Sequence, residues 1–236
     1  MSEILGLFDA SLAGSLLRFA TPILLAALGG MLCERAGVLN IGLEGLMLTG
    51  AFAAVVGSYL GGSATGGVAL AVGASMLLSL AFAWFAVTLR GDEIVVGIAV
   101  NLLASGLTVY LLRSMFGVKG AFQDPSIVGL TAVRLPGIDA LPGIGPLLSG
   151  HTPLVYLALI ATGAVYLMLF HLPVGLRLRG VGEHPEAATT LGVDVPRYRY
   201  GALLASGALC GLAGAQLSLG NVTLFVENMS AGRGWI

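Results

Sequence analysis

The run "ATGGVALAVGASMLLSLAFAWFAVTL", residues 64–89, decides the fold class because it contains no Asp, Glu, Lys or Arg. A helix needs about 20 mostly apolar residues to cross the hydrocarbon core of a bilayer. Soluble domains carry charges at about one position in four, so an uncharged apolar run of this length is foreign to them. The stretch therefore predicts a transmembrane helix.

Composition extends this prediction to the whole chain. Of its 236 residues, 57% are hydrophobic and only 10% are charged, against about 45–50% and about 25% in soluble domains. We predict an all-α polytopic membrane protein, built as a single transmembrane domain over residues 1–236 with about six transmembrane helices. Runs of spanning length lie at residues 10–33, 41–60, 64–89, 94–112, 152–171 and 200–220.

Arginines set the predicted orientation, because short cytoplasmic loops retain Lys and Arg. The connection at 172–199 holds four arginines, the densest basic cluster in the sequence, so we place it in the cytoplasm. Counting back through the spans puts Arg35 and Arg90 inside, and residue 1 and the Gly- and Pro-rich connection at 113–151 outside. This outer connection is either an irregular solvated loop or a docking surface for a soluble partner.

A weak internal repeat appears when the sequence is shifted by 181 positions, which pairs Arg18 with Arg199 and Asn40 with Asn221. In the predicted topology the first span runs inward and the sixth runs outward. The two copies would therefore be inverted, as in many transporter folds. On this basis Ile236 falls near the start of a second half, whose later spans would be lacking.

The most polar stretch is "RGVGEHPEAATTLGVDV" at residues 179–195, and it predicts a short helix. Pro185 suits the first turn of a helix, Glu183 and Glu186 suit its positive N-terminal end, and Gly192 suits its stop. Ala187, Ala188 and Leu191 are expected to share one small face. A helix this short is unstable alone in water, so this face must pack on a partner or on the cytoplasmic ends of its own bundle.

Two stretches resemble a known family. "RLRGVGEHPEAATTLGVDVPRYR" (177–199) is similar to the cytoplasmic loop of ABC importer permeases in the branched-chain amino acid, simple sugar and nucleoside class. Its Gly-x-x-Pro-x-Ala-Ala…Gly pattern, which forms the coupling helix there, corresponds to Gly182, Pro185, Ala187, Ala188 and Gly192. "ERAGVLNIGLEGLMLTGAF" (34–52) resembles the stretch after the first shared span in the subset linked to nucleoside uptake.

The resemblance implies a permease subunit of an importer in the inner (cytoplasmic) membrane, most closely one for nucleosides. It implies three partners: a cytoplasmic ABC ATPase that receives the coupling helix, a second permease subunit, identical or paralogous, and an external substrate-binding protein or lipoprotein. Permeases of this class continue past a "GRG" segment such as 232–234 into further spans. The chain has no Gly-x-x-x-x-Gly-Lys-Ser/Thr loop for phosphates, so ATP hydrolysis is expected in a separate chain.

Polar residues in apolar spans are costly and often mark transport pathways. Asn40 and Glu44 lie four residues apart, on one helical face, with glycines that suggest a broken helix start. Asn101 is central in the fourth span, and Asn221 matches Asn40 through the repeat. We predict that these four residues line the substrate pathway. The alternatives are that Glu44 caps a neighbouring helix and that Asn101 forms an interhelical hydrogen bond.

Other functional classes fit the sequence less well. The net charge of −1 without a basic patch gives no reason to expect nucleic acid. The three histidines have no metal-ligand spacing and no nucleophile motif beside them, so we expect no metal, no cofactor and no membrane enzyme. A simple sugar or branched-chain amino acid ABC permease remains an alternative, as does an ion-coupled secondary transporter, which the inverted repeat also permits.

Overall fold

The computed structural model describes residues 10–133 and 149–235. Within these residues, six helices are long and apolar enough to span a membrane, as predicted. A π-helical turn extends two of them, since η1 (Trp84–Thr88) follows α4 and η2 (Gln216–Val222) follows α10. The six helices are α2 (Ala10–Arg35), α3 (Leu43–Gly61), α4 (Ala64–Ala83), α5 (Glu93–Phe116), α7 (Pro153–His171) and α10 (Val195–Ala215).

Two short helices and a small ladder complete the described fold. α8 (Pro173–Glu183) and α9 (Pro185–Thr190) lie between α7 and α10. The predicted connection at 172–199 is thus two successive helices and not a loop with one. β1 (Ala121–Phe122) pairs antiparallel with β2 (Phe225–Val226). Residues 134–148, in the predicted outer connection, lie outside the described residues.

Local signals explain where the spans begin. Ser63 caps α4 by accepting a hydrogen bond from the Gly66 amide at 3.2 Å. Asp92 accepts from the amides of Ile94 and Val95 at the start of α5, and Asp194 caps α10 in the same way. A side-chain oxygen at this position satisfies an amide that has no partner inside the helix. Composition thus defines the spans, and these caps fix their first residues.

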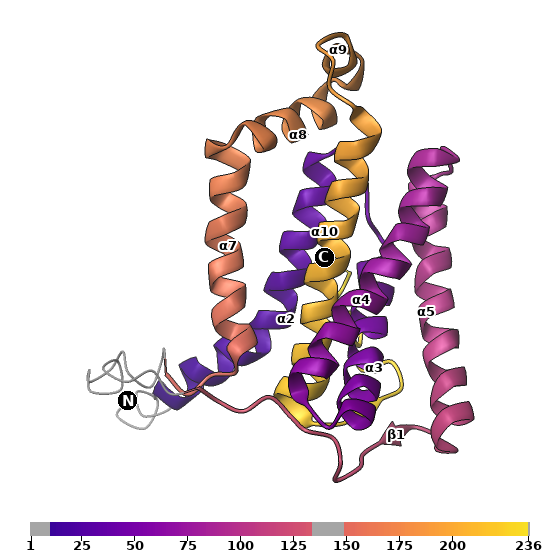
Figure 1. Ribbon diagram of the computed structural model, residues 1–236, viewed down its shortest axis with the longest axis vertical. Helices are drawn as coiled ribbons and strands as arrows, with labels where there is room; N and C mark the ends of the chain where they lie inside the picture. Colours follow the sequence, from indigo (N-terminus) through magenta and orange to yellow (C-terminus); the bar gives the residue numbers. More distant parts are fainter. Residues whose placement is uncertain (1–9, 134–148, 236) are drawn as a thin grey trace, which may run out of the picture.

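Small residues let the central helices approach closely. α10 packs against α4 through Gly207 and Gly211, where an added Cβ would lie 2.6 Å from Ser79 Cβ and 2.8 Å from Ala71 O. Gly214 faces the backbone of α3 at Met47. Glycine pairs of this kind allow backbone contact between membrane helices. α3 and α10 therefore form the buried centre of the bundle, and α4 packs against both of them with one face (Figure 1).

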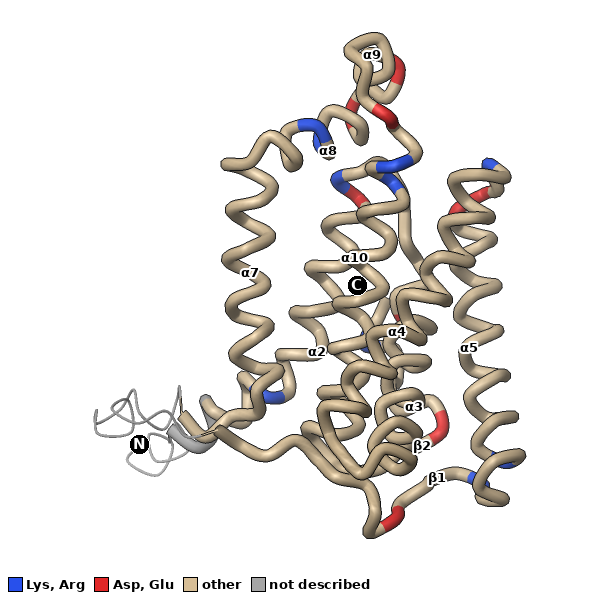
Figure 2. The backbone as a smooth tube through the Cα atoms, in the orientation of Figure 1, with Lys and Arg blue, Asp and Glu red and all other residues tan. Residues whose placement is uncertain are grey.

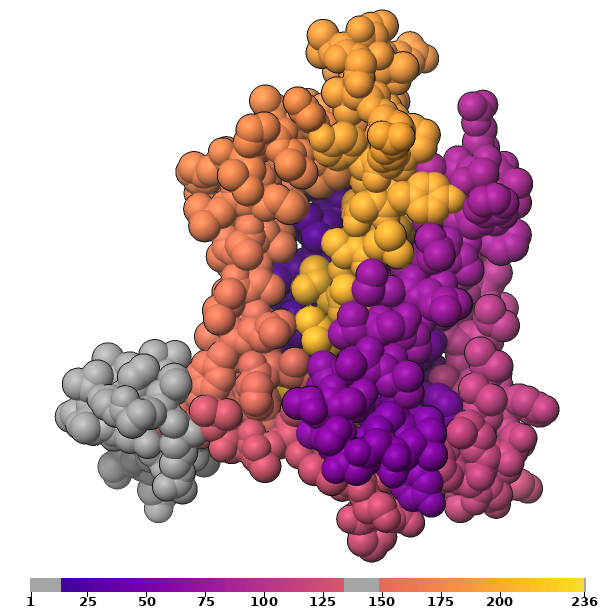
Figure 3. Space-filling view, in the orientation of Figure 1, coloured from indigo at the N-terminus to yellow at the C-terminus, as the bar shows by residue number. Residues whose placement is uncertain are grey.

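α7 stands away from this centre. Figure 3 shows a hollow between α7 and α10, with α2 visible behind it. The hollow holds an apolar cleft of about 390 Å³ between α2, α7, α8 and α10, whose lining includes Leu32, Met168, Leu178 and Ala202. α7 also leaves large apolar side chains exposed, such as Ile160 at 71%. Such a surface suits the hydrocarbon of a bilayer or another apolar helix.

Charged residues gather at the two ends of the bundle, and the lengths of the helices are largely free of them (Figure 2). The end that carries α8 and α9, called here the α9 end, also carries Arg35 and Arg90. Arg90 lines the same pocket as Pro185 and Arg199, and the Arg35 carbonyl lies against Gly182. The prediction that these arginines share one side is confirmed, while the assignment of that side to the cytoplasm stays a prediction.

α2 and α10, which contain the two copies of the predicted repeat, run in opposite directions side by side (Figure 1). α2 runs toward the α9 end, whereas α10 begins there and runs away from it. After each helix the chain turns back: residues 36–42 lead into α3, and residues 223–235 return to the middle of the bundle. This arrangement has the inverted orientation expected from the repeat.

Candidate functional site

The short helix α9 projects at the α9 end of the bundle (Figure 1). Pro185 occupies its first turn, and Gly192 stops it with a φ of +77°, as predicted. The hydroxyls of Thr189 and Thr190 donate to the carbonyls of Pro185 and Ala187, both at 2.8 Å. Both threonine hydroxyls of α9 therefore have hydrogen-bond acceptors within the helix itself. α9 is a small projection from the end of the bundle.

The predicted common face of Ala187, Ala188 and Leu191 is wrong. Ala188 is buried against the bundle, while Ala187 is exposed and Leu191 is 83% exposed. The reason is the length of α9, which ends at Thr190, so Leu191 lies beyond the helix and outside its periodicity. Ala188 is thus covered by other residues of this chain, and Ala187, Glu186 and Leu191 are exposed.

Gly182 and Glu183 also differ from the prediction, because they end α8 and do not start α9. Gly182 lies directly on the turn after α2: a Cβ there would be 2.5 Å from the Arg35 carbonyl oxygen and 3.0 Å from the Gly37 amide nitrogen. Glu183 is exposed. The predicted coupling residues therefore divide into an inward contact at Gly182 and Ala188 and an outward surface.

The second group of predicted residues surrounds the start of α3, where the chain enters from an extended segment. Asn40 is 7% exposed, and its amide nitrogen donates to Ser206 Oγ at 3.2 Å and to Cys33 Sγ at 3.8 Å. Its oxygen accepts from the Gly42 amide at 3.0 Å. Asn40 thus ties the segment before α3 to α2 and α10.

Asn101 performs the matching role from α5. Its oxygen accepts from the Gly45 amide at 2.7 Å, and its nitrogen donates to the Ile41 carbonyl at 3.0 Å. Gly45 lies in the first turn of α3, where backbone amides have no partner inside the helix. Asn101 therefore caps α3 from a neighbouring helix, in agreement with the alternative of an interhelical hydrogen bond.

Glu44 meets the returning segment 223–235. Its two carboxylate oxygens accept from the backbone amides of Gly232 at 2.8 Å and Gly234 at 2.6 Å. Gly234 lies so close to Glu44 that a Cβ on it would be 2.5 Å from the Glu44 Cα. The carboxylate also lies at the N-terminal end of α3, which favours negative charge. Glu44 therefore joins the start of α3 to a segment nearly 190 residues away.

Asn221 lies apart from the other three predicted pathway residues. Its side-chain oxygen accepts from Gln216 Nε2 at 3.2 Å, and Gln216 Oε1 accepts from the Thr152 hydroxyl at 2.8 Å. Gln216 is fully buried. This chain of hydrogen bonds joins the end of α10 to the start of α7, away from Asn40, Glu44 and Asn101.

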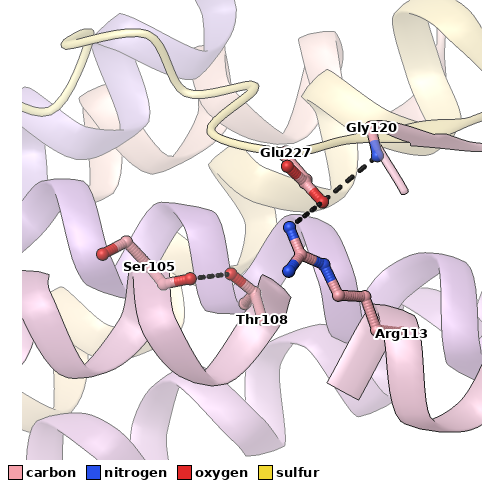
Figure 4. A network of polar contacts seen from close by, with 5 residues as sticks. All are labelled: Ser105, Thr108, Arg113, Gly120 and Glu227. Atoms are coloured by element: carbon pink, nitrogen blue, oxygen red, sulfur yellow. Dashed lines mark hydrogen bonds and ion pairs between the residues drawn. The ribbon is translucent and has the colours of Figure 1, made fainter. Parts of the chain in front are cut away.

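Figure 4 shows a further link, which lies next to β1, at the end of the bundle opposite α9 (Figure 1). Glu227 accepts from the Gly120 amide at 3.1 Å and lies 3.6 Å from Arg113 Nη2, while its own amide donates to the Gly120 carbonyl. These contacts hold the segment after α5 against the returning segment 223–235, beside the β1–β2 pair. The beginning of the predicted outer connection is thus ordered.

Sequence reasoning missed Ser206 and Gln216, which are fully buried partners of the predicted residues. Both are polar residues in the mostly apolar run 200–220, and their place in that run was the available signal. No group of three or more His, Cys, Asp or Glu side chains in the described ranges is placed to hold a metal ion.

A polytopic bundle of six apolar helices, with α3 entered through the non-helical residues 36–42 and a pair of short helices at one end, suits a membrane transport subunit. The comparison with known families agrees, because the profile described as the permease component of the branched-chain amino acid transport system matches residues 12–236. The chain belongs to this family. It is therefore a permease subunit of an ATP-binding-cassette (ABC) transporter, a multi-pass protein of the cell membrane.

Curated relatives support this assignment over most of the chain. A putative glucose ABC transporter permease of Haloferax volcanii is 37% identical over 97% of the chain and 69% of the relative. A guanosine ABC transporter permease of Bacillus subtilis is 35% identical, covering 92% and 70%. A nucleoside ABC transporter permease of Lactococcus lactis is 36% identical, covering 95% and 72%. No solved structure matches the chain. ABC permeases work in general with ATPase and substrate-binding partners.

Proposed function

We propose that the chain is the membrane subunit of an ATP-driven importer that moves nucleosides into the cell. Support comes from the stretch at 34–52 and from two relatives whose names specify guanosine and nucleosides. The Haloferax relative is named for glucose, so a simple sugar is the second candidate substrate. Ribose in a nucleoside and a free sugar share the hydroxyl groups that such a pathway must recognise.

The observation that carries the coupling part of the proposal is the outward surface of α9. Ala187 is small, Leu191 is 83% exposed and Glu186 is exposed beside them. A helix of six residues that projects from the end of the bundle, with small and polar side chains on its exposed side, has a shape suited to a groove of another protein. We assign Gly182, Glu183, Pro185, Glu186, Ala187, Ala188, Leu191 and Gly192 to coupling with a cytoplasmic ABC ATPase, which supplies the ATP hydrolysis.

The substrate pathway is proposed to pass the start of α3, which the non-helical residues 36–42 precede. Substrate sites in many transporters lie where helix ends and irregular backbone line a cavity inside the bundle. Glu44 is partly exposed there and supplies the only charge among the four candidates. Asn40 and Asn101 hold this segment in shape, and Asn221 positions the end of α10. The complete transporter also needs a second permease subunit and an external substrate-binding protein or lipoprotein.

The experiment is uptake of labelled guanosine, glucose and leucine in cells that express the chain with its ATPase and binding protein. Guanosine uptake that requires ATP and is lost in Ala187→Arg supports the proposal. Glucose or leucine uptake in its place would move the substrate to the second candidate or to a branched-chain amino acid. Uptake driven by an ion gradient without ATP would contradict the proposal.

A further inference from the structure

The contact between α8 and the turn after α2 is made by two backbones with no side chain between them. A Cβ on Gly182 would lie 2.5 Å from the Arg35 carbonyl oxygen, and one on Gly37 would lie 3.0 Å from Gly182 Cα. Gly37 also has a φ of +71°, which L side chains rarely adopt. Because neither side can yield by rotating a side chain, movement of one backbone presses directly on the other.

On one side, the contact is linked to α9 by a short and stiff path. The His184 amide donates to the Gly180 carbonyl at 3.0 Å, and the Ala188 amide donates to the His184 carbonyl at 3.0 Å. α8 and α9 are therefore joined through a single residue with hydrogen bonds on both sides. A displacement of α9 must move the last turn of α8, which contains Gly182.

On the other side, the contact leads through the non-helical residues 38–42 to the start of α3. The Val38 amide donates to the Cys33 carbonyl at 3.0 Å, and the Leu39 amide donates to the Glu93 carboxylate. Asn40 and Asn101 then fasten the segment to the first turn of α3. The path from Gly37 to α3 is thus held by backbone and side-chain hydrogen bonds at nearly every residue.

We infer that the Gly182–Gly37 contact transmits movement of α9 to the start of α3. Gly182 and Gly37 are positioning residues in this inference, which rests on the proposed function because it assumes that an ATPase moves α9. It goes beyond that function by naming the contact through which a displacement of α9 reaches the spanning helices.

The test measures hydrogen exchange at the amides of residues 38–46. The full chain is placed in lipid nanodiscs, with and without the ATPase and a non-hydrolysable ATP analogue. In the wild type we expect nucleotide-bound ATPase to change exchange in this segment by about tenfold, the size of a shift of 1.4 kcal/mol. Gly182→Ala should remove most of this change, since its methyl group forces the two backbones apart. Gly180→Ala is the matched control, because it lies in the same helix with nothing within 4 Å of an added Cβ.

A second variant tests the contact from the other side in case Gly182→Ala does not fold. Gly37→Asn retains a residue that tolerates the left-handed conformation but adds a side chain at the contact. Its control is Gly117→Asn, at a φ of +67° with open space around it. Wild-type exchange changes in folded Gly182→Ala or Gly37→Asn would overturn the inference. Failure of the wild-type chain to bind the ATPase would instead overturn the proposed function, and this outcome is seen before any variant is compared.

Discussion

Replacing Asn101 by leucine should destabilise the bundle by removing the cap on α3. Leucine is similar in size but leaves the Gly45 amide and the Ile41 carbonyl without their partner. Side-chain hydrogen bonds between membrane helices contribute about 0.6–2 kcal/mol each, and a buried group left unpaired costs about 1–3 kcal/mol. We expect Asn101→Leu to lower the free energy of unfolding by about 2–4 kcal/mol, and hydrogen exchange at Gly45 to accelerate by more than about tenfold.

The assay is unfolding of the purified full chain in mixed micelles by titration with SDS, followed by circular dichroism. Ser105→Ala is the control, one turn along the same helix, because the Ser105 hydroxyl bonds only to Leu102 within α5. It should change stability by less than about 0.5 kcal/mol. Unchanged stability of Asn101→Leu, together with lost uptake per folded molecule, would refute the capping role and favour direct contact with substrate.

Three other predictions address the coupling surface, the charge at α3 and the orientation. Ala187→Arg should leave the free energy of unfolding unchanged but weaken ATPase binding by at least about tenfold, measured by co-purification. Ala188 is buried, so Ala188→Arg should instead lower the free energy of unfolding by more than about 2 kcal/mol. Glu44→Gln keeps one of two acceptor oxygens and should retain part of the uptake per folded molecule, while Glu44→Leu should retain very little; normal uptake with leucine would remove Glu44 from the pathway. In a cysteine-free background, an impermeant thiol reagent applied to intact cells should label Ser63→Cys and not Thr190→Cys, and the reverse pattern would invert the topology.

The spans could be predicted from the sequence because their signals are local. A long apolar run identifies each membrane helix, and capping residues such as Asp92 and Asp194 lie where helices begin. The projection at α9 was also predictable from Pro185 and Gly192. These signals depend only on neighbouring residues, so no knowledge of the tertiary packing was needed.

The contacts that shape the candidate site depend on residues far apart in the sequence. Nothing near Asn101 shows that it caps α3, and nothing near Glu44 shows that its partners are Gly232 and Gly234. The separate helix α8 was missed because its two arginines were interpreted as part of a cytoplasmic loop. Pro173 lies in its first turn, as Pro185 does in α9, and was the available signal. α8 has 11 residues and contains Arg177 and Arg179, so a search for apolar runs of spanning length passes over it.

The glycine contacts of α10 bear on how this chain can vary during evolution. At Gly207, Gly211 and Gly214 an added methyl group would meet backbone atoms of α3 or α4, and no change of rotamer can relieve such a clash. α7 presents mostly exposed apolar side chains, for which many residues are equivalent. We therefore expect the residues of α7 to vary widely among homologous chains. Glycine should be kept at these three positions of α10, because no other residue fits there.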